Sequence, residues 1–272
     1  MIALRFCFLL AWVAASLPAQ SGAPAESAEL NADRPGFTTG TAVVGHGVFQ
    51  FESGFSFGRE GDGAHVFSAP SPLIRIGVGD RFEMRFQSEG YLSTTGDNAN
   101  GGVRRSGLSD SAAGVKWRLW GEKRLLPALA IVPSLSLPIG HRWFTSAGYD
   151  PSLELDWSKG LPQGFALGAS VRVSSVTGGD RRWVERAISV AASRRLLAGL
   201  SGYAEIGGVH SSDPSLGPAR VVNGGVVRSL GKNIQVDIEA GRGLTGAGPK
   251  YFFAAGLVVR QPHGLPHAPR AR

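Results

Sequence analysis

The stretch from Leu73 to Leu92 constrains the fold more than any other part of the chain. It reads as two strands joined by a tight turn at Gly79-Asp80, two residue types that suit a short hairpin. Successive side chains of a strand point to opposite faces, so the strict alternation after this turn gives one apolar and one charged face. The apolar face holds Phe82, Met84 and Phe86, and the charged face holds Arg81, Glu83, Arg85, Gln87 and Glu89.

A hairpin with these two faces fits two kinds of fold. A soluble sandwich would bury the apolar face and leave the charges in water, whereas a transmembrane barrel would turn the apolar face to lipid and the charges to its lumen. The composition favours a strand-rich chain, because it has 39 glycines and only 18% charged residues. After the N-terminus the sequence has no apolar run long enough for a membrane-spanning helix.

The same alternation recurs along the chain in about twelve segments, most of which are long enough to cross a bilayer when tilted. Every second connection is a tight turn, whereas the others are generally longer and more polar, which is typical of outer-membrane barrels. The sequence therefore predicts an all-β protein, a closed antiparallel up-and-down transmembrane β-barrel over residues 46–260 in the cell outer membrane. The expected strands are 46–58, 65–78, 80–92, 109–120, 124–138, 150–161, 165–177, 182–196, 200–210, 219–230, 234–239 and 251–260, with a polar loop over 93–108.

The two ends of the chain differ from this pattern. Residues 1–20 have the basic start and the short apolar stretch of a secretory signal peptide, and they contain the single cysteine, Cys7. Residues 21–45 show neither helical nor strand periodicity, so we expect an N-terminal periplasmic segment that leads into the first strand. Residues 261–272 are basic and rich in proline, which predicts a disordered tail.

Neither the charge nor the short motifs predict an enzyme, a nucleic-acid partner or a cofactor. The formal charge is +7, but the arginines are scattered and no nucleic-acid motif accompanies them. Gly54-Phe-Ser-Phe-Gly58 matches a nucleophile elbow without its strand-turn-helix context, and Gly241-Arg-Gly-Leu-Thr-Gly246 matches a dinucleotide fingerprint that no helix follows. His263 and His267 have metal-ligand spacing only on a helix, which the surrounding prolines oppose. We therefore expect no catalytic, cofactor-binding or metal-binding residue.

Charged side chains on the polar faces of the strands are the candidate functional residues, because a barrel would direct them into its lumen. They can line a polar conduit that selects solutes, or they can form a ladder of ion pairs that satisfy one another. The ladder is the simpler main role for most of them. The set comprises Glu52, Arg75, Glu83, Arg85, Glu89, Lys116, Arg118, Glu154, Asp156, Arg172, Glu205, Asp237 and Glu239.

A series of short motifs in a fixed order resembles a known bacterial family. They are Asn31-Ala-Asp-Arg-Pro-Gly-Phe-Thr38, Gln50-Phe-Glu-Ser-Gly54, Leu73-Ile-Arg-Ile-Gly-Val-Gly-Asp-Arg-Phe-Glu83, Gly107-Leu-Ser-Asp110, Gly114-Val-Lys-Trp117, Leu135-Ser-Leu-Pro-Ile-Gly140, Tyr203-Ala-Glu205 and Gln235-Val-Asp-Ile238. The set resembles the outer-membrane transporter family associated with the meta pathway of phenol degradation. This resemblance implies a β-barrel that passes small organic molecules.

The expected function is passive passage of small, aromatic or hydrophobic solutes, with outer-membrane lipid as the surrounding partner. One alternative is a barrel-borne lipid hydrolase that uses His210 with a neighbouring serine, because Val209-His-Ser-Ser-Asp213 places the required residue types together. Another is a barrel that only stabilises the envelope. We also expect Trp117, Trp143, Trp157, Trp183, Tyr149, Tyr203 and Tyr251 to form interfacial girdles. The sequence leaves the solute, the direction of passage and the oligomeric state open.

Overall fold

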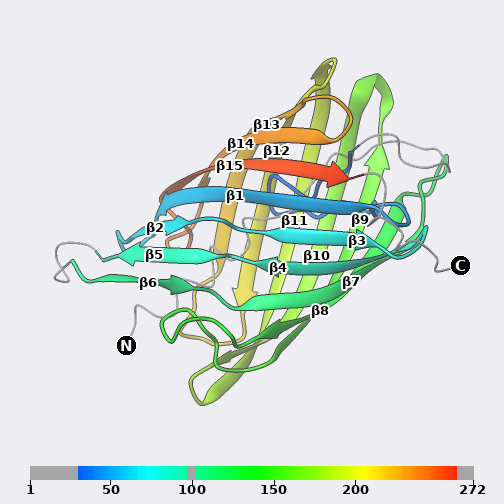
Figure 1. Ribbon diagram of the computed structural model, residues 1–272. Coiled ribbons are helices and arrows are strands. Elements are labelled where there is room, and N and C mark those ends of the chain that lie inside the picture. The colour runs from blue at the N-terminus through cyan, green and yellow to red at the C-terminus, as the bar shows by residue number, and fades with distance from the viewer. Residues whose placement is uncertain (1–29, 97–101, 262–272) are drawn as a thin grey trace, which may run out of the picture.

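The computed structural model describes residues 30–96 and 102–261, and these residues form a closed antiparallel β-barrel (Figure 1). The expected signal peptide and most of the expected tail lie outside the described residues. The strand segments are β1 (Phe49–Arg59), β2 (His65–Ser68), β3 (Leu73–Gly77), β4 (Phe82–Ser88), β5 (Tyr91–Thr95), β6 (Arg104–Leu108), β7 (Ser111–Trp120), β8 (Ala128–Leu137), β9 (Asp150–Gly160), β10 (Phe165–Gly178), β11 (Arg181–Leu197), β12 (Leu200–Ser211), β13 (Ala219–Ser229), β14 (Ile234–Gly243) and β15 (Tyr251–Gln261).

Three pairs of these segments each form one interrupted strand, so the barrel has twelve strands. The segments β2 and β3 both pair with β1, at opposite ends, and β4–β5 and β6–β7 continue the same arrangement. The interruptions fall around Pro70–Pro72, where prolines break the ladder, at Gly90, which has a positive φ, and at Ser109–Asp110. Pairing of β1 with β15 from Phe49↔Gln261 to Arg59↔Tyr251 closes the barrel.

The predicted barrel is confirmed, and the main error in the strand boundaries concerns the loop expected over 93–108. That stretch contains the end of β5 and all of β6, which pair with each other from Tyr91↔Leu108 to Thr95↔Arg104. The sequence did not predict these strands, because the glycines and serines of this region give little alternation of apolar and polar side chains. The segment expected over 182–196 is a strand, β11. In the described part of the chain, no helix is long and apolar enough to span a membrane.

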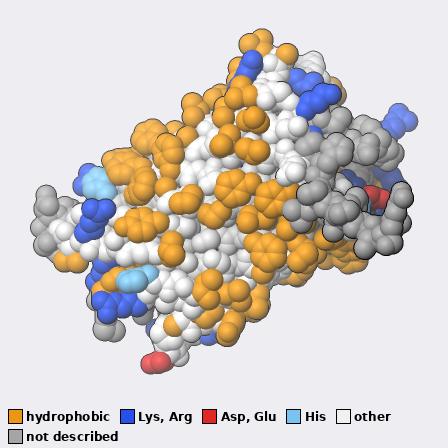
Figure 2. Space-filling model, viewed as in Figure 1, with side chains coloured by type: hydrophobic (Ala, Val, Ile, Leu, Met, Phe, Trp, Pro, Cys, Tyr) orange, Lys and Arg blue, Asp and Glu red, His pale blue; other side chains and the backbone are white. Residues whose placement is uncertain are grey.

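The barrel carries its apolar side chains outside and its charged side chains inside. Phe82, Met84 and Phe86 on β4 are exposed, whereas the intervening Glu83 and Arg85 are buried. Hydrophobic side chains are spread over the visible wall, while basic residues gather near the two ends (Figure 2). Trp117 lies on this outer surface and stacks on Phe82 at 5.5 Å between ring centroids. Such a surface is suited to hydrocarbon, and its inside is suited to polar contacts.

The interior is filled in part by residues 30–45, here called the inner segment, which enters the barrel and turns back to reach β1 (Figure 1). Its beginning packs on β15, where Leu30 and Ala32 cluster with Val258. Phe37 lies farther along the barrel, against Val66 and Ala254. The chain then returns, and Gly47 N–H donates to the carbonyl of Gly77 just before β1 begins. Residues 30–45 of the expected N-terminal segment thus lie inside the barrel before they lead into β1, and residues 21–29 lie outside the described residues.

Candidate functional site: the barrel interior

The best-connected group inside the barrel is centred on Asp33 of the inner segment. Its carboxylate accepts hydrogen bonds from Lys116 Nζ at 2.7 and 3.0 Å and from Arg85, and lies 3.6 Å from Arg75 Nη1. The Asp33 backbone N–H donates to the Glu52 carboxylate at 2.9 Å. We call the group formed by Asp33, Glu52, Arg75, Glu83, Arg85 and Lys116 the Asp33 cluster.

Charges within the Asp33 cluster balance, with three carboxylates facing three cations. Arg75 is fully buried and reaches Glu83 at 2.8 Å and Glu52 at 3.0 Å. Burial alone would raise the pKa of Asp33, but the positive charges of Arg75, Lys116 and Arg85 hold that pKa well below its ordinary value. Removing one charge from such a buried, mutually bonded group leaves another charge unpaired, which is costly.

A second set of carboxylates holds the first part of the inner segment. Glu205 accepts hydrogen bonds from the backbone N–H groups of Phe37 and Thr38, and also from the Thr38 hydroxyl. Arg34 lies 3.3 Å from Asp237, and Gly36 N–H donates to Glu239 at 3.3 Å. These contacts tie the inner segment to β12 and β14.

The returning part of the inner segment is held by different strands. Thr39 N–H donates to Ser170 Oγ at 2.9 Å, and the hydroxyls of Thr41 and Ser158 are 2.6 Å apart. Val44 N–H donates to Glu83 at 2.7 Å. The inner segment thus spans the interior and makes hydrogen bonds to strands on both sides.

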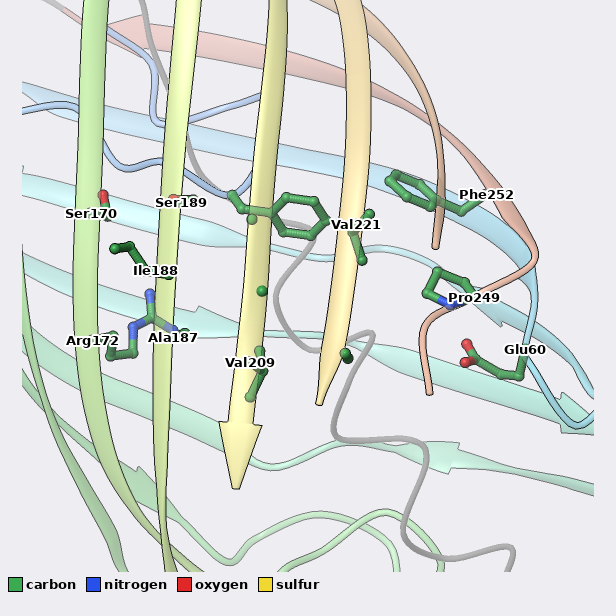
Figure 3. Close-up of a pocket in the computed structure, with 14 residues that line it drawn as sticks. Glu60, Ser170, Arg172, Ala187, Ile188, Ser189, Val209, Val221, Pro249 and Phe252 are labelled. Carbon is green, nitrogen blue, oxygen red and sulfur yellow. The ribbon is translucent and has the colours of Figure 1, made fainter. Parts of the chain in front are cut away.

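Among the cavities inside the described part of the barrel, two are lined by both Phe37 and Arg172. The larger, here called the vestibule cavity, has a volume of about 170 Å³ and is walled by β4, β7, β8, β9, β10 and adjoining residues. The smaller, here called the apolar alcove, has about 40 Å³ (Figure 3). Glu60 and Pro249 reach the alcove from loops at one end of the barrel, whereas Ser170 and Arg172 project from β10. Both Glu60 carboxylate oxygens are buried without a hydrogen-bond partner in the described structure.

Most of the charged residues expected in the lumen are indeed buried, and the structure joins many of them through the inner segment. Those in the Asp33 cluster are Glu52, Arg75, Glu83, Arg85 and Lys116, and those near Arg34 and Thr38 are Glu205, Asp237 and Glu239. Glu154 pairs with Arg172, and Asp156 accepts a hydrogen bond from Ser170 at 2.7 Å. Glu89 and Arg172 line the vestibule cavity.

Arg118 is separate from these groups. Its guanidinium donates to the carbonyl of Asp80 at 2.7 Å, so this half-buried residue covers the turn between β3 and β4. The strand alternation correctly gives its face but not its position at the end of the barrel.

Sequence reasoning missed Asp33 and Arg34, although the motif that contains them was recognised. A physical argument could have found them. A set of inward-facing charges requires partners, and the nearby polar segment without strand periodicity can supply those partners. Two expected girdle residues, Tyr203 and Trp183, also face inward. Tyr203 shares the face of buried Glu205, and Trp183 donates to Glu185 at 3.0 Å.

The residues of the hydrolase alternative are not assembled into a catalytic group. His210 is exposed, whereas Ser211 on the opposite face is buried. Asp213 accepts hydrogen bonds from the backbone and hydroxyl of Ser215. Within the described residues, no hydrogen bond joins His210 to a serine or an aspartate, and no group of three or more His, Cys, Asp or Glu residues could hold a metal ion.

An apolar outer wall, a closed ladder and a charged interior define an outer-membrane β-barrel. The chain belongs to the family described as "Putative MetA-pathway of phenol degradation", whose model matches residues 32–261. That match begins within the inner segment and ends with β15.

Solved structures support the same fold. The COG4313 outer membrane channel from Pseudomonas putida F1 has 14% sequence identity and a TM-score of 0.60, covering 81% of this chain and 98% of that chain. The NanC porin has 10% identity and a TM-score of 0.52, covering 78% and 98% of the respective chains. A search of curated proteins by sequence found no significant match.

Proposed function

We propose that the protein is a passive channel through the outer membrane for small, largely apolar organic molecules. The observation that carries this proposal is the vestibule cavity of about 170 Å³ inside a closed barrel, partly walled by Phe37, Leu92, Phe144 and Val176. A cavity of about 150 Å³ in a protein can hold benzene, so a single substituted ring fits.

The inner segment is proposed to limit this passage. Phe37 lies beside both cavities, and the remainder of the segment crosses the interior between the vestibule and the barrel end where β1 begins. A solute would pass when the inner segment shifts, while the wall stays closed by its backbone hydrogen bonds. No reaction is proposed, because the interior charges bind one another and the inner segment rather than forming a nucleophile and base.

Uptake of radiolabelled toluene by a Gram-negative host tests this proposal. Cells with the protein should take up toluene faster than cells with an empty vector. Ala112→Phe, which places a ring in the vestibule cavity, should return uptake toward the vector level. Ala192→Phe adds the same ring on the exposed outer face of β11 and should leave uptake unchanged.

Folded protein in the outer membrane is verified for each variant by the heat-dependent mobility shift of barrels on gels. Uptake equal to the empty vector, with folded wild-type protein present, would contradict the channel and favour the envelope-stabilising alternative. Release of fatty acid that is lost in His210→Ala would favour the hydrolase.

A further inference from the structure

The vestibule cavity is lined by more acidic than basic side chains. Four acidic residues line it, namely Glu89, Asp110, Asp150 and Glu185, whereas Arg172 is the one base among the lining residues. Arg172, which is partly exposed, forms an ion pair with the buried Glu154, so its charge already has a partner. The surplus is notable because the chain as a whole is basic, with a formal charge of +7.

The four acids differ in how well the protein satisfies them. Asp110 accepts backbone hydrogen bonds from Gly140 and Ser146, both at 2.8 Å, so it serves as a loop anchor. Glu185 accepts one bond from Trp183 at 3.0 Å. The backbone carbonyl of Glu89 accepts a hydrogen bond from Ser68 Oγ at 3.4 Å, whereas its carboxylate shows no hydrogen bond among the described residues; Glu89 lies at the interruption between β4 and β5.

Asp150 gives the strongest evidence for a ligand site in the vestibule cavity. It is only 8% exposed, and its Oδ1 accepts a hydrogen bond from Thr177 at 2.6 Å. Its Oδ2 is buried with no hydrogen-bond partner in the described structure. The nearest cation, Arg182, approaches Oδ1 at 3.5 Å with a side chain that is about half exposed. A buried carboxylate oxygen without a donor is costly, and a ligand donor at this position would remove that cost.

Part of the cavity wall is apolar. Leu92, Phe144 and Val176 are each buried and line the same space as Phe37. The acids are too dispersed to act as a metal site, since no group of three or more acidic, His or Cys side chains in the described residues could hold a metal ion. An organic cation fits better, because its carbon skeleton can contact the apolar wall while its ammonium donates to a carboxylate on the acidic part of the wall.

We propose that the vestibule cavity is a binding site for small aromatic molecules that carry a protonated amine, with the ammonium held by Asp150 and with Glu89 adding negative charge to the wall of the same cavity. The ring lies against Phe37, Leu92 and Phe144. This inference deepens the proposed channel function by naming a class of solute, and it rests on that function.

Isothermal titration calorimetry tests the site. It measures how tightly 2-phenylethylamine and 2-phenylethanol bind the purified barrel in non-ionic detergent at pH 7.5. The two molecules share the ring and differ at the polar end, where only the amine is charged. The amine should bind roughly 10-fold more tightly, as expected for charge-assisted hydrogen bonds. In the double variant Asp150→Asn/Glu89→Gln, the preference should fall to about 1.

The variants are chosen to preserve the fold. Asparagine at position 150 can still accept the bond from Thr177, and the Glu89 side chain shows no hydrogen bond to lose. Asp80→Asn is the control, because it removes one acid from an exposed turn outside the cavity and should keep the preference. If the double variant does not fold, Glu89→Gln alone should still reduce the preference.

Equal binding of the two molecules to the wild type, or an unchanged amine preference in the folded double variant, would overturn the site. The proposed function is separable from this result. Toluene uptake without amine preference would leave the channel intact and remove the site, whereas amine preference without toluene uptake would leave the site and contradict the channel.

Discussion

Replacing Asp33 by asparagine should release the inner segment while leaving the barrel wall closed. The substitution keeps the size of the side chain but removes one of the three negative charges of the Asp33 cluster. Lys116 Nζ loses an ionic partner at 2.7 Å, and Arg85 loses one as well. Both cations are buried, with side-chain exposures of 0% and 5%.

The expected cost follows from that burial. Breaking a buried ion pair by removing one partner typically costs about 3–5 kcal/mol, because the remaining charge is left uncompensated. The β1–β15 ladder and the other strand pairs do not involve Asp33, so this cost should fall on docking of the inner segment. The population with an undocked segment should then rise roughly 10²- to 10⁴-fold.

A cysteine at position 32 reports this change. Ala32 is 3% exposed and packs by Val258, and the only native cysteine is Cys7 in the expected signal peptide. The rate of maleimide labelling at Ala32→Cys should rise steeply in the Asp33→Asn background. Asp80→Asn is the control and should not change the rate.

Two results would refute the reasoning. One is an unchanged labelling rate in folded Asp33→Asn protein. Adding Lys116→Met to Asp33→Asn restores equal numbers of positive and negative charges in the cluster, so the double variant should recover part of the lost docking. The other refuting result is a double variant that is labelled as fast as Asp33→Asn alone.

Three further predictions follow from other parts of the barrel. Burial, with a smaller contribution from Asp62, raises the pKa of Glu60 to about 7 from an ordinary value of 4.5, so the folded state holds its proton more tightly than the unfolded state. The stability of the wild type should therefore fall by up to about 3 kcal/mol as pH rises from 4.5 through 7. Thermal unfolding of Glu60→Gln should show a weaker dependence on pH. The same pH dependence in both proteins would contradict this prediction. Leu155→Arg places a charge on the outer face of β9 and should cost about 2–4 kcal/mol in denaturant titrations into lipid vesicles, whereas Leu125→Arg in an 88% exposed turn should cost little. Gly90→Ala should reduce the yield of folded barrel, because a Cβ there would lie 1.5 Å from the Pro70 carbonyl oxygen at a φ of +69°; Gly231→Ala, with open space but a similar φ, should be milder.

The strands and their two faces could be predicted from the sequence because a strand repeats every two residues. The alternation around Phe82, Glu83 and Met84 is a local property, and it directly encodes which side chains meet lipid. The tight turns at alternate connections then fixed the up-and-down order. Where the alternation weakens, as between Ser93 and Leu108, the strands were missed.

The inner segment could not be placed from its sequence because its contacts are not periodic. Asp33 is held by Arg75, Arg85 and Lys116, which lie far along the chain, and the backbone N–H groups of Phe37 and Thr38 donate to Glu205. A backbone donor has no residue-specific signature. The inward charges were expected to satisfy one another across strands, and much of that role belongs to the inner segment instead.

The most direct test of the account is a covalent lock on the inner segment. Thr41 Oγ1 and Ser158 Oγ are 2.6 Å apart, so Thr41→Cys/Ser158→Cys places two sulfurs within reach of a disulfide. Toluene uptake should drop to the empty-vector level in the oxidised double variant and return when dithiothreitol is added, while each single variant behaves like the wild type. Undiminished uptake by a fully cross-linked, folded barrel would contradict control of passage by residues 30–45.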